Sequence, residues 1–132
     1  MTDLYVQSDA NVALGSYISV NLKTLGYTDV YVGASVPSTA KPKMVILTNN
    51  GGSDINQVLS DQMVTVNIWH TSQSGLSTLS EVVHALAKQA NNEQIANVHV
   101  VVRPTDVALD DALPHRFMRY QVLTRPQQTL SL

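Results

Sequence analysis

The chain has 132 residues, of which 44% are apolar and only 14% are charged, and its formal net charge is −2. This length favours one domain over residues 1–132, and the net negative charge argues against a nucleic-acid-binding protein, which would usually carry a basic stripe. The absence of cysteine excludes disulfides, thiolate metal sites and a cysteine nucleophile, and no apolar run reaches the ~20 residues that a membrane span needs.

The first predicted element is a helix over residues 8–27. Ser8 or Asp9 is a suitable N-cap, and Gly26 suits the left-handed position after the last turn. Positions three and four residues apart place an apolar stripe on one side of this helix, made of Leu14, Ile18, Leu22 and Leu25. The N-terminus lacks the pattern of a secretion signal, and residues 1–7 are expected to be flexible.

Three strands are predicted next, because the apolar period changes from about 3.6 to two. The first covers residues 29–36 and ends at Pro37. The second covers residues 42–50, and Gly51-Gly52 after it predicts a turn. The third covers residues 62–70 and alternates Val64, Val66 and Ile68 with Thr65, Asn67 and Trp69.

A second helix is predicted over residues 74–92. Its apolar stripe is Leu76, Leu79, Val83, Leu86 and Ala90. Opposite this stripe lie Glu81, His84 and Lys88, so His84 is expected to be a solvated surface residue. Strands over residues 97–104 and 116–125 follow, joined by an acidic loop over 105–115, and residues 126–132 are expected to be flexible.

These elements predict an α+β fold in the order α-β-β-β-α-β-β. Two helices with one apolar stripe each can share one face of a mainly antiparallel sheet of four to five strands, which gives a two-layer sandwich. By alternation, the other sheet face then carries Tyr31, Trp69, Val101, Phe117 and Leu123 among Thr65, Asn67, Arg119 and Gln121. A face that holds the only Trp and the only Phe needs a cover, which is either a loop or another subunit.

The stretch "DDALPHRFMRY" (110–120) is the main candidate for chemistry. Asp110, Asp111 and His115 are residue types of acid–base or metal sites. Adjacent aspartates on an extended loop point to different sides, however, and no third orienting group is evident. A small hydrolase or metal enzyme built on these residues is one hypothesis. The other is an interface loop in which Asp110, Asp111 and Arg116 pair with another subunit.

Other chemical motifs are missing. "SQSGLS" (72–77) lacks the G-x-S-x-G elbow, and "NNGGSD" (49–54) lacks the Gly-Lys-Ser/Thr of a P-loop. No two histidines have metal-ligand spacing. The residues therefore predict no catalytic site, no metal and no cofactor.

The segments "VYVGASVP", "KPKMVILTNNGG", "SDQMVTVNIWHTS", "LSEVVHALA" and "DVALDDALPHRFMRYQVLTR", in this order and spacing, resemble the tail terminator proteins of long-tailed phages, especially those of actinobacteriophages. The resemblance covers residues 8–125, and no single motif is diagnostic. The matching positions are Val36-Pro37, Gly51-Gly52, Asp61, Trp69, Asp110 or Asp111, Pro114 and Arg116-Phe117. The chain departs from the family at Thr48-Asn49-Asn50, where members often have an arginine, and in a longer loop over residues 53–60.

The resemblance implies a structural virion protein at the head-proximal end of the tail. Such proteins form a hexameric ring on the tail tube, stop its polymerisation and present a docking surface to the head–neck connector, while DNA only passes through. Its interface residues would then be Tyr31, Trp69, Asp110, Asp111, Arg116, Phe117 and Arg119. A head–tail connector or neck protein is the alternative within the virion.

Overall fold

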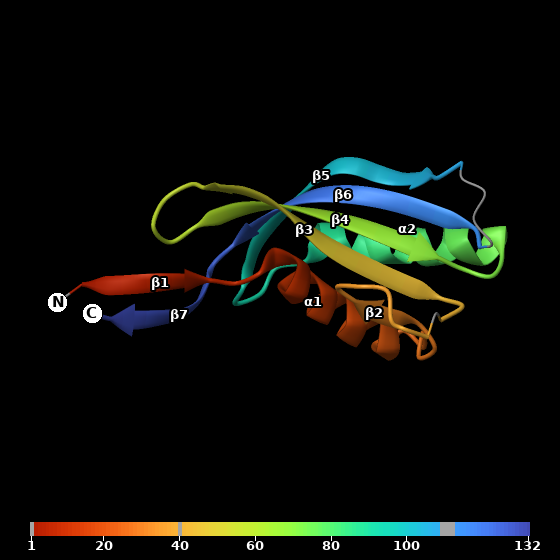
Figure 1. Cartoon of the computed structure of the whole chain (residues 1–132), viewed down its shortest axis with the longest axis horizontal. Coiled ribbons are helices and arrows are strands. Elements are labelled where there is room, and N and C mark those ends of the chain that lie inside the picture. Colours follow the sequence, from red (N-terminus) through yellow and green to blue (C-terminus); the bar gives the residue numbers. More distant parts are fainter. Residues whose placement is uncertain (1, 40, 109–112) are drawn as a thin grey trace.

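The computed structural model describes residues 2–39, 41–108 and 113–132. Two helices and seven strands follow one another along the chain (Figure 1). They are β1 (Asp3–Gln7), α1 (Ala10–Thr24), β2 (Tyr31–Gly33), β3 (Met44–Asp54), β4 (Ser60–Trp69), α2 (Gln73–Gln89), β5 (Ile95–Asp106), β6 (His115–Thr124) and β7 (Pro126–Ser131).

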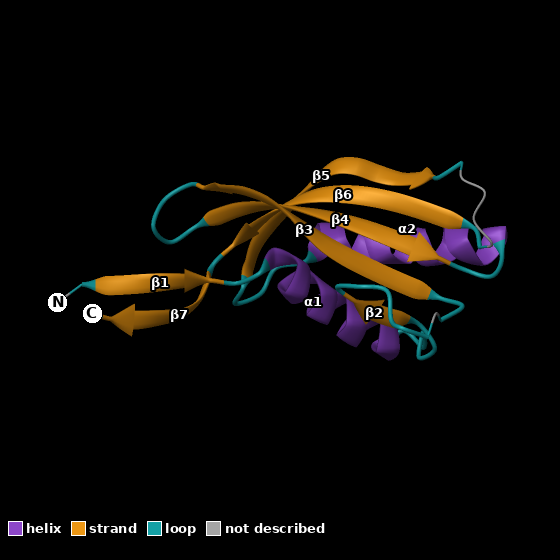
Figure 2. Ribbon diagram, viewed as in Figure 1, coloured by secondary structure: helices purple, strands orange, loops and turns teal. Residues whose placement is uncertain are grey.

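The main layer is a five-stranded sheet in the order β2-β3-β4-β6-β5. All its pairs are antiparallel except β2 with β3, which are parallel. Both helices lie on the same face of this sheet, α1 along β2 and β3 and α2 along β5 and β6 (Figure 2). The predicted α+β sandwich with its helices on one face is confirmed.

The core lies between the helices and the sheet. Side chains of α1, α2 and the three central strands are fully buried there, among them Leu14, Ile18, Leu22, Val64, Val66, Ile68, Leu76, Leu79, Val83, Met118 and Val122. Burying one such side chain contributes roughly 1.5–3 kcal/mol. The predicted helix stripes are therefore largely correct. Leu25 lies beyond the end of α1 and is exposed, Leu86 is only partly buried, and Ala90 is buried just beyond the end of α2.

The first predicted strand is much shorter than expected. Only Tyr31–Gly33 pair with β3, in parallel register from Tyr31 with Met44 to Gly33 with Ile46. A parallel pair needs a connection that returns the chain to the same end of the sheet. Residues 34–39 and 41–43 belong to that return, so the alternation that continues through Ala34 to Val36 lies outside the strand and is exposed.

The predicted turn at Gly51-Gly52 is wrong. The strand continues through both glycines to Asp54, and the register shifts between Asn49 and Gly52, so the glycines form a bulge. Both have positive φ, +85° at Gly51 and +152° at Gly52, which L-residues rarely adopt. The hairpin instead turns over residues 55–59, where the Asn56 side chain accepts from the Val58 and Leu59 N–H groups.

The two ends of the chain form elements that the sequence did not predict. β1 and β7 pair antiparallel as a separate two-stranded sheet, which we call the terminal ribbon (residues 2–7 and 126–132). Backbone hydrogen bonds between Thr2 and Leu132 continue the pairing. Figure 1 shows both termini side by side at the tip of this ribbon, away from the sandwich. No helix in the described parts of the chain is long and apolar enough to cross a membrane.

Candidate functional site

The sheet face that points away from both helices, which we call the outer face, is built from rows of register partners. One row joins Tyr31 on β2, Met44 on β3, Trp69 on β4 and His115 on β6. Directly opposite residues on one face lie about 4.5–5.5 Å apart and pack together. A row of three aromatic rings and one methionine, which we call the aromatic row, therefore crosses four of the five strands.

The next two rows are mixed. Ile46, Asn67 and Phe117 form one, and Thr48, Thr65 and Arg119 form the other. Arg119 Nε donates to Thr65 Oγ1 at 3.3 Å, and Thr65 Oγ1 donates to Asn50 Oδ1 at 2.5 Å. These hydrogen bonds hold the Arg119 side chain along the face.

Trp69 and His115 are stacked at the end of the aromatic row. Their ring centroids are 4.2 Å apart with an interplanar angle of 15°. His115 Nε2 and Asn67 Oδ1 are 2.9 Å apart and form a hydrogen bond. These contacts fix the orientation of the indole, which gives the outer face a rigid aromatic anchor.

The register confirms which predicted residues share the outer face. Tyr31, Trp69, Phe117, Arg119 and Leu123 all lie on it, and Figure 2 shows that no helix of the described residues covers it. One position differs. A bulge lies between Val100 and Val102, so Val102 rather than Val101 is the partner of Arg119.

Sequence reasoning missed Met44 and Ile46 as members of the outer face. Both are only 5% exposed, although they point away from the helices. The signal was available, because Met44 and Ile46 alternate with the core residues Val45 and Leu47. A strand that is apolar on both faces is typical of a sheet covered on both sides.

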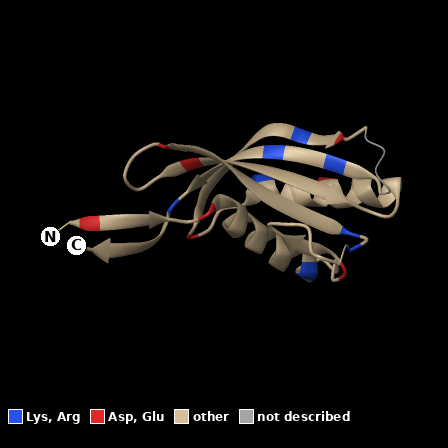
Figure 3. Ribbon diagram, in the orientation of Figure 1, with Lys and Arg blue, Asp and Glu red and all other residues tan. Residues whose placement is uncertain are grey.

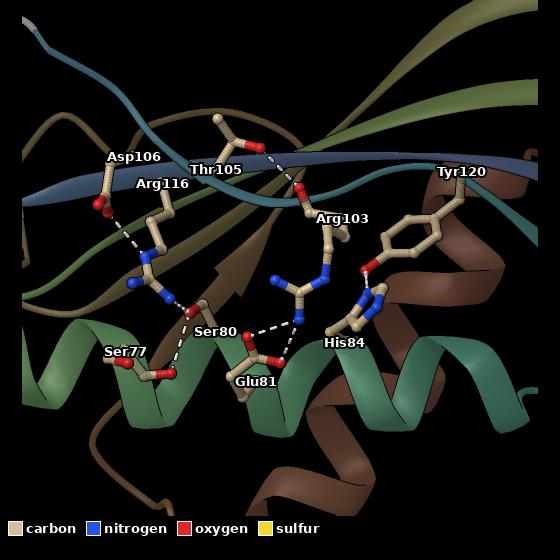
Figure 4. Close-up of polar contacts among 9 residues, drawn as sticks. All are labelled: Ser77, Ser80, Glu81, His84, Arg103, Thr105, Asp106, Arg116 and Tyr120. Atoms are coloured by element: carbon tan, nitrogen blue, oxygen red, sulfur yellow. Dashed lines mark hydrogen bonds and ion pairs between the residues drawn. The ribbon is translucent and has the colours of Figure 1, made fainter.

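Arg116, predicted as an interface residue, lies on the opposite face, and its side chain is only 16% exposed. Its Nε donates to Asp106 Oδ1 at 2.8 Å and its Nη1 to Ser80 Oγ at 3.0 Å, so it ties β6 to β5 and α2 (Figure 4). The hydrogen bond from Arg116 lowers the pKa of the Asp106 carboxyl. The geometry gives Arg116 partners within its own chain, and a role between subunits stays a prediction.

A second ion pair joins the same two layers. Arg103 Nη2 on β5 lies 2.9 and 3.2 Å from the two carboxylate oxygens of Glu81 on α2 (Figure 4). Both side chains are largely exposed, and exposed pairs of this kind contribute little to stability. Their contact orients β5 on α2 rather than forming a reactive site.

The prediction that His84 is a solvated surface residue is wrong. His84 is buried against the sheet, and its Nδ1 lies 2.6 Å from the Tyr120 hydroxyl (Figure 4). Burial lowers the pKa of His84 and raises the pKa of Tyr120. The helical wheel failed here because Tyr120 supplies the hydrogen-bond partner that lets a polar residue sit at the edge of the core.

The other chemical candidates form no site among the described residues. Asp110 and Asp111 lie outside the described residues, so their predicted interface role stays a prediction. Nδ1 of His70 accepts from the N–H of Ser72 at 3.1 Å, and the Ser72 side chain in turn caps α2 by accepting from the Gly75 N–H. Burial lowers the pKa of His70. Among the described residues, no three His, Asp or Glu side chains form a group that could hold a metal ion.

Charge is dispersed over the molecule. The described Lys and Arg residues lie on both helices, on β5 and β6, and in the loops before β3 and before β7 (Figure 3). No stripe of the kind that follows a nucleic-acid backbone forms in the part that the structure describes. The outer face, with its aromatic row and Arg119, is therefore the strongest candidate for a functional surface.

Comparison with protein-family models gives no match for this chain, and comparison with curated proteins gives no significant match.

Proposed function

We propose that this chain is a tail terminator of a long-tailed phage, a ring-forming structural protein that caps the tail tube and presents a surface to the head–neck connector. The order and spacing of its motifs, which resemble that family, supply the identity. The structural observation that supports an assembly role is the outer face, an aromatic sheet surface that no described helix covers.

The proposal gives the outer face a partner. In a monomer, Trp69 and Phe117 would border water, although aromatic and Arg residues are enriched at the centres of protein interfaces. A stable interface buries about 800 Å² per partner, which an outer face spanning five strands can supply. The partner is a neighbouring subunit or the tail tube, and the net charge of −2 suits a conduit that must release its DNA.

A tube-capping experiment tests the proposal. Purified major tail tube protein from the phage that encodes this chain is polymerised with and without the chain, and tube lengths are measured by electron microscopy. A terminator should stop growth and appear as a ring at one tube end. Unrestricted growth with binding to the portal–neck complex instead would make the chain a head–tail connector, and binding to neither would overturn a virion role.

The proposal also states that the chain has no catalytic activity, and a substitution at His115 tests this part. An enzyme built on His115 with Asp110 or Asp111 should lose its activity in a His115→Gln variant. In the structure His115 is stacked on Trp69 and bonded to Asn67. We therefore expect His115→Gln to change the outer face, and with it capping.

A further inference from the structure

The terminal ribbon exposes apolar side chains on one of its faces. Leu4 is the register partner of Leu130, and these residues are 42% and 45% exposed. Leu132, two residues further along, is 80% exposed. Because side chains two apart share a face of a strand, these three leucines form one apolar surface, which we call the ribbon leucines.

The ribbon has little to hold it in place. It is a two-stranded sheet without a connecting turn, since its strands are the two ends of the chain. Isolated pairs of strands are marginally stable in water even when a turn joins them. At its base, Gln7 donates to the Val58 carbonyl and Ser8 to the Arg125 carbonyl, while the tip extends away from the sandwich (Figure 1). A further surface would stabilise it.

The same chain offers an apolar groove. It lies between α1 and the edge of the main sheet, has a volume of about 350 Å³, and is lined by Asn11, Val12, Gly15, Ser16, Ser19, Val20, Val32, Gly33, Ala34 and Leu47. Val12 and Val20 are 56% and 63% exposed. With Ser16 between them at four-residue spacing, they form a second, solvent-facing stripe on α1. None of the described residues that line this groove is charged.

The sheet edge beside the groove is open. β2 is the terminal strand of the sheet, and the Tyr31 N–H donates to the carbonyl oxygen of Lys43, the residue just before β3. Since backbone groups alternate in direction along a strand, the N–H and C=O of Val32 point away from β3. An extended segment in the groove could therefore pair with β2 as well as bury leucines, which is the usual chemistry of strand addition.

The ribbon does not lie in the groove of its own molecule. Figure 1 shows the ribbon at one end of the long axis, pointing away from the sandwich, while β2 lies past the middle of that axis. Complementary surfaces at two different places on one subunit produce a head-to-tail contact, which closes into a ring when the rotation permits.

We propose that the terminal ribbon is an arm that inserts its leucines into the groove between α1 and β2 of a second copy of this chain. The contact joins two apolar surfaces and buries no charged side chain of the groove lining. The desolvation cost of forming it is therefore small. A six-residue strand such as β7 is about 20 Å long, enough to lie along several turns of α1. This inference deepens the proposed function. It rests on that function only in taking the assembly to be a ring.

Cysteine trapping tests this contact directly, because the chain has no cysteine of its own. One preparation carries Leu132→Cys and a second, of different mass through an affinity tag, carries Val20→Cys. The two preparations are mixed at high concentration and mildly oxidised. Mass spectrometry should then find a mixed disulfide between the cysteines introduced at positions 132 and 20. The matched control replaces Val20→Cys by Ala85→Cys, an exposed position on α2, which should give far less mixed product.

Non-covalent association supplies a second measurement. In sedimentation over a range of concentrations, Leu130→Ser with Leu132→Ser should shift association of the full chain to at least tenfold higher concentration. Val12→Ser with Val20→Ser should do the same, and the unfolding midpoints of both variants should show that they fold.

The outcomes separate this contact from the proposed function. Equal trapping at Val20 and Ala85, or no mixed product up to the solubility limit, overturns the arm–groove contact even if the chain caps tail tubes. Specific trapping in a chain that fails to cap tubes would keep the self-contact and overturn the terminator role.

Discussion

His84 and Tyr120 place two hydrogen-bonded polar side chains at the edge of the core, and the burial of His84 makes stability depend on pH. Burial, aided by the positive charge of Lys88, lowers the pKa of His84 below its ordinary 6.5. As the pH falls below that value the unfolded chain binds a proton at His84 more readily than the folded chain. The free energy of unfolding should therefore be highest above pH 6.5 and decrease as the pH falls.

Urea unfolding at a series of pH values between 7.5 and 5 measures this effect. The His84→Gln variant should show a weaker pH dependence than the wild type. Some dependence should remain, because burial also lowers the pKa of His70, and a second substitution, His70→Gln, should reduce it further. A pH profile unchanged by His84→Gln would show that the buried pair does not control the titration.

Gly51 and Gly52 form a matched pair at the bulge of β3. A Cβ at Gly52 would lie 1.9 Å from the Asp61 carbonyl oxygen, whereas a Cβ at Gly51 would meet nothing within 4 Å. Gly51→Ala should therefore cost only the backbone strain of its positive φ, about 1–2 kcal/mol. Gly52→Ala should lower the free energy of unfolding by clearly more, because β3 and β4 must separate. Equal losses in chemical unfolding would contradict this account of the bulge.

At the scale of elements, the longer strands and α2 were predictable because their alternation or helical stripe continues over most of their length. β4 is the best example, since Val64, Val66 and Ile68 point to the core as the sequence indicates. The length of β2 was not predictable, because β2 ends where its backbone pairing with β3 ends, and that pairing covers only Tyr31–Gly33. The ribbon was also missed, because each of its strands gains its hydrogen bonds only from the other end of the chain.

The outer face was largely predictable for the same reason, since period two assigns Tyr31, Trp69 and Phe117 to one side. Two features of the outer face depend on contacts between strands and could not be predicted from the sequence. The bulge at Val101 exchanges one residue of the face for its neighbour. Arg116 and Arg119 are three residues apart, so they point to opposite faces of β6, and only the structure shows that Arg116 is held by Asp106 and Ser80.

This difference between the two arginines gives a prediction for β6. Arg116→Ala removes hydrogen bonds between β6, β5 and α2, so it should lower the melting temperature. Arg119→Ala removes an outer-face side chain whose hydrogen bond is to Thr65 at 3.3 Å, so it should leave the melting temperature nearly unchanged and weaken assembly. Thermal unfolding and the tube-capping experiment measure the two effects, and the reverse pattern would show that the outer face is not the interface.

At the scale of the whole molecule, the proposed function and the proposed arm–groove contact would use three separate surfaces of the described residues. The ribbon lies at one end, the groove beside β2 lies past the middle of the long axis, and the outer face covers the side opposite the helices (Figures 1 and 2). If ribbon and groove join neighbouring subunits, the outer face is available in part for the tail tube. A ring subunit in a tail needs both kinds of contact, because it binds its neighbours laterally and the tube axially.

Trp69 tests the outer face in the assembled particle. Its indole is held by stacking on His115 and lies on the row with Tyr31 and Met44, so truncation removes the largest anchor of the face while the core beneath it is intact. We expect Trp69→Ala to fold with a melting temperature within a few degrees of the wild type, and to cap tubes at least tenfold less effectively, because central aromatic anchors typically contribute 2 kcal/mol or more to an interface. Leu25→Ala is the matched control, since Leu25 is exposed at the end of α1 and away from the outer face, and it should cap normally. Trp69→Ala particles with tails of normal length would show that neither the ring nor the tube is held through the aromatic row.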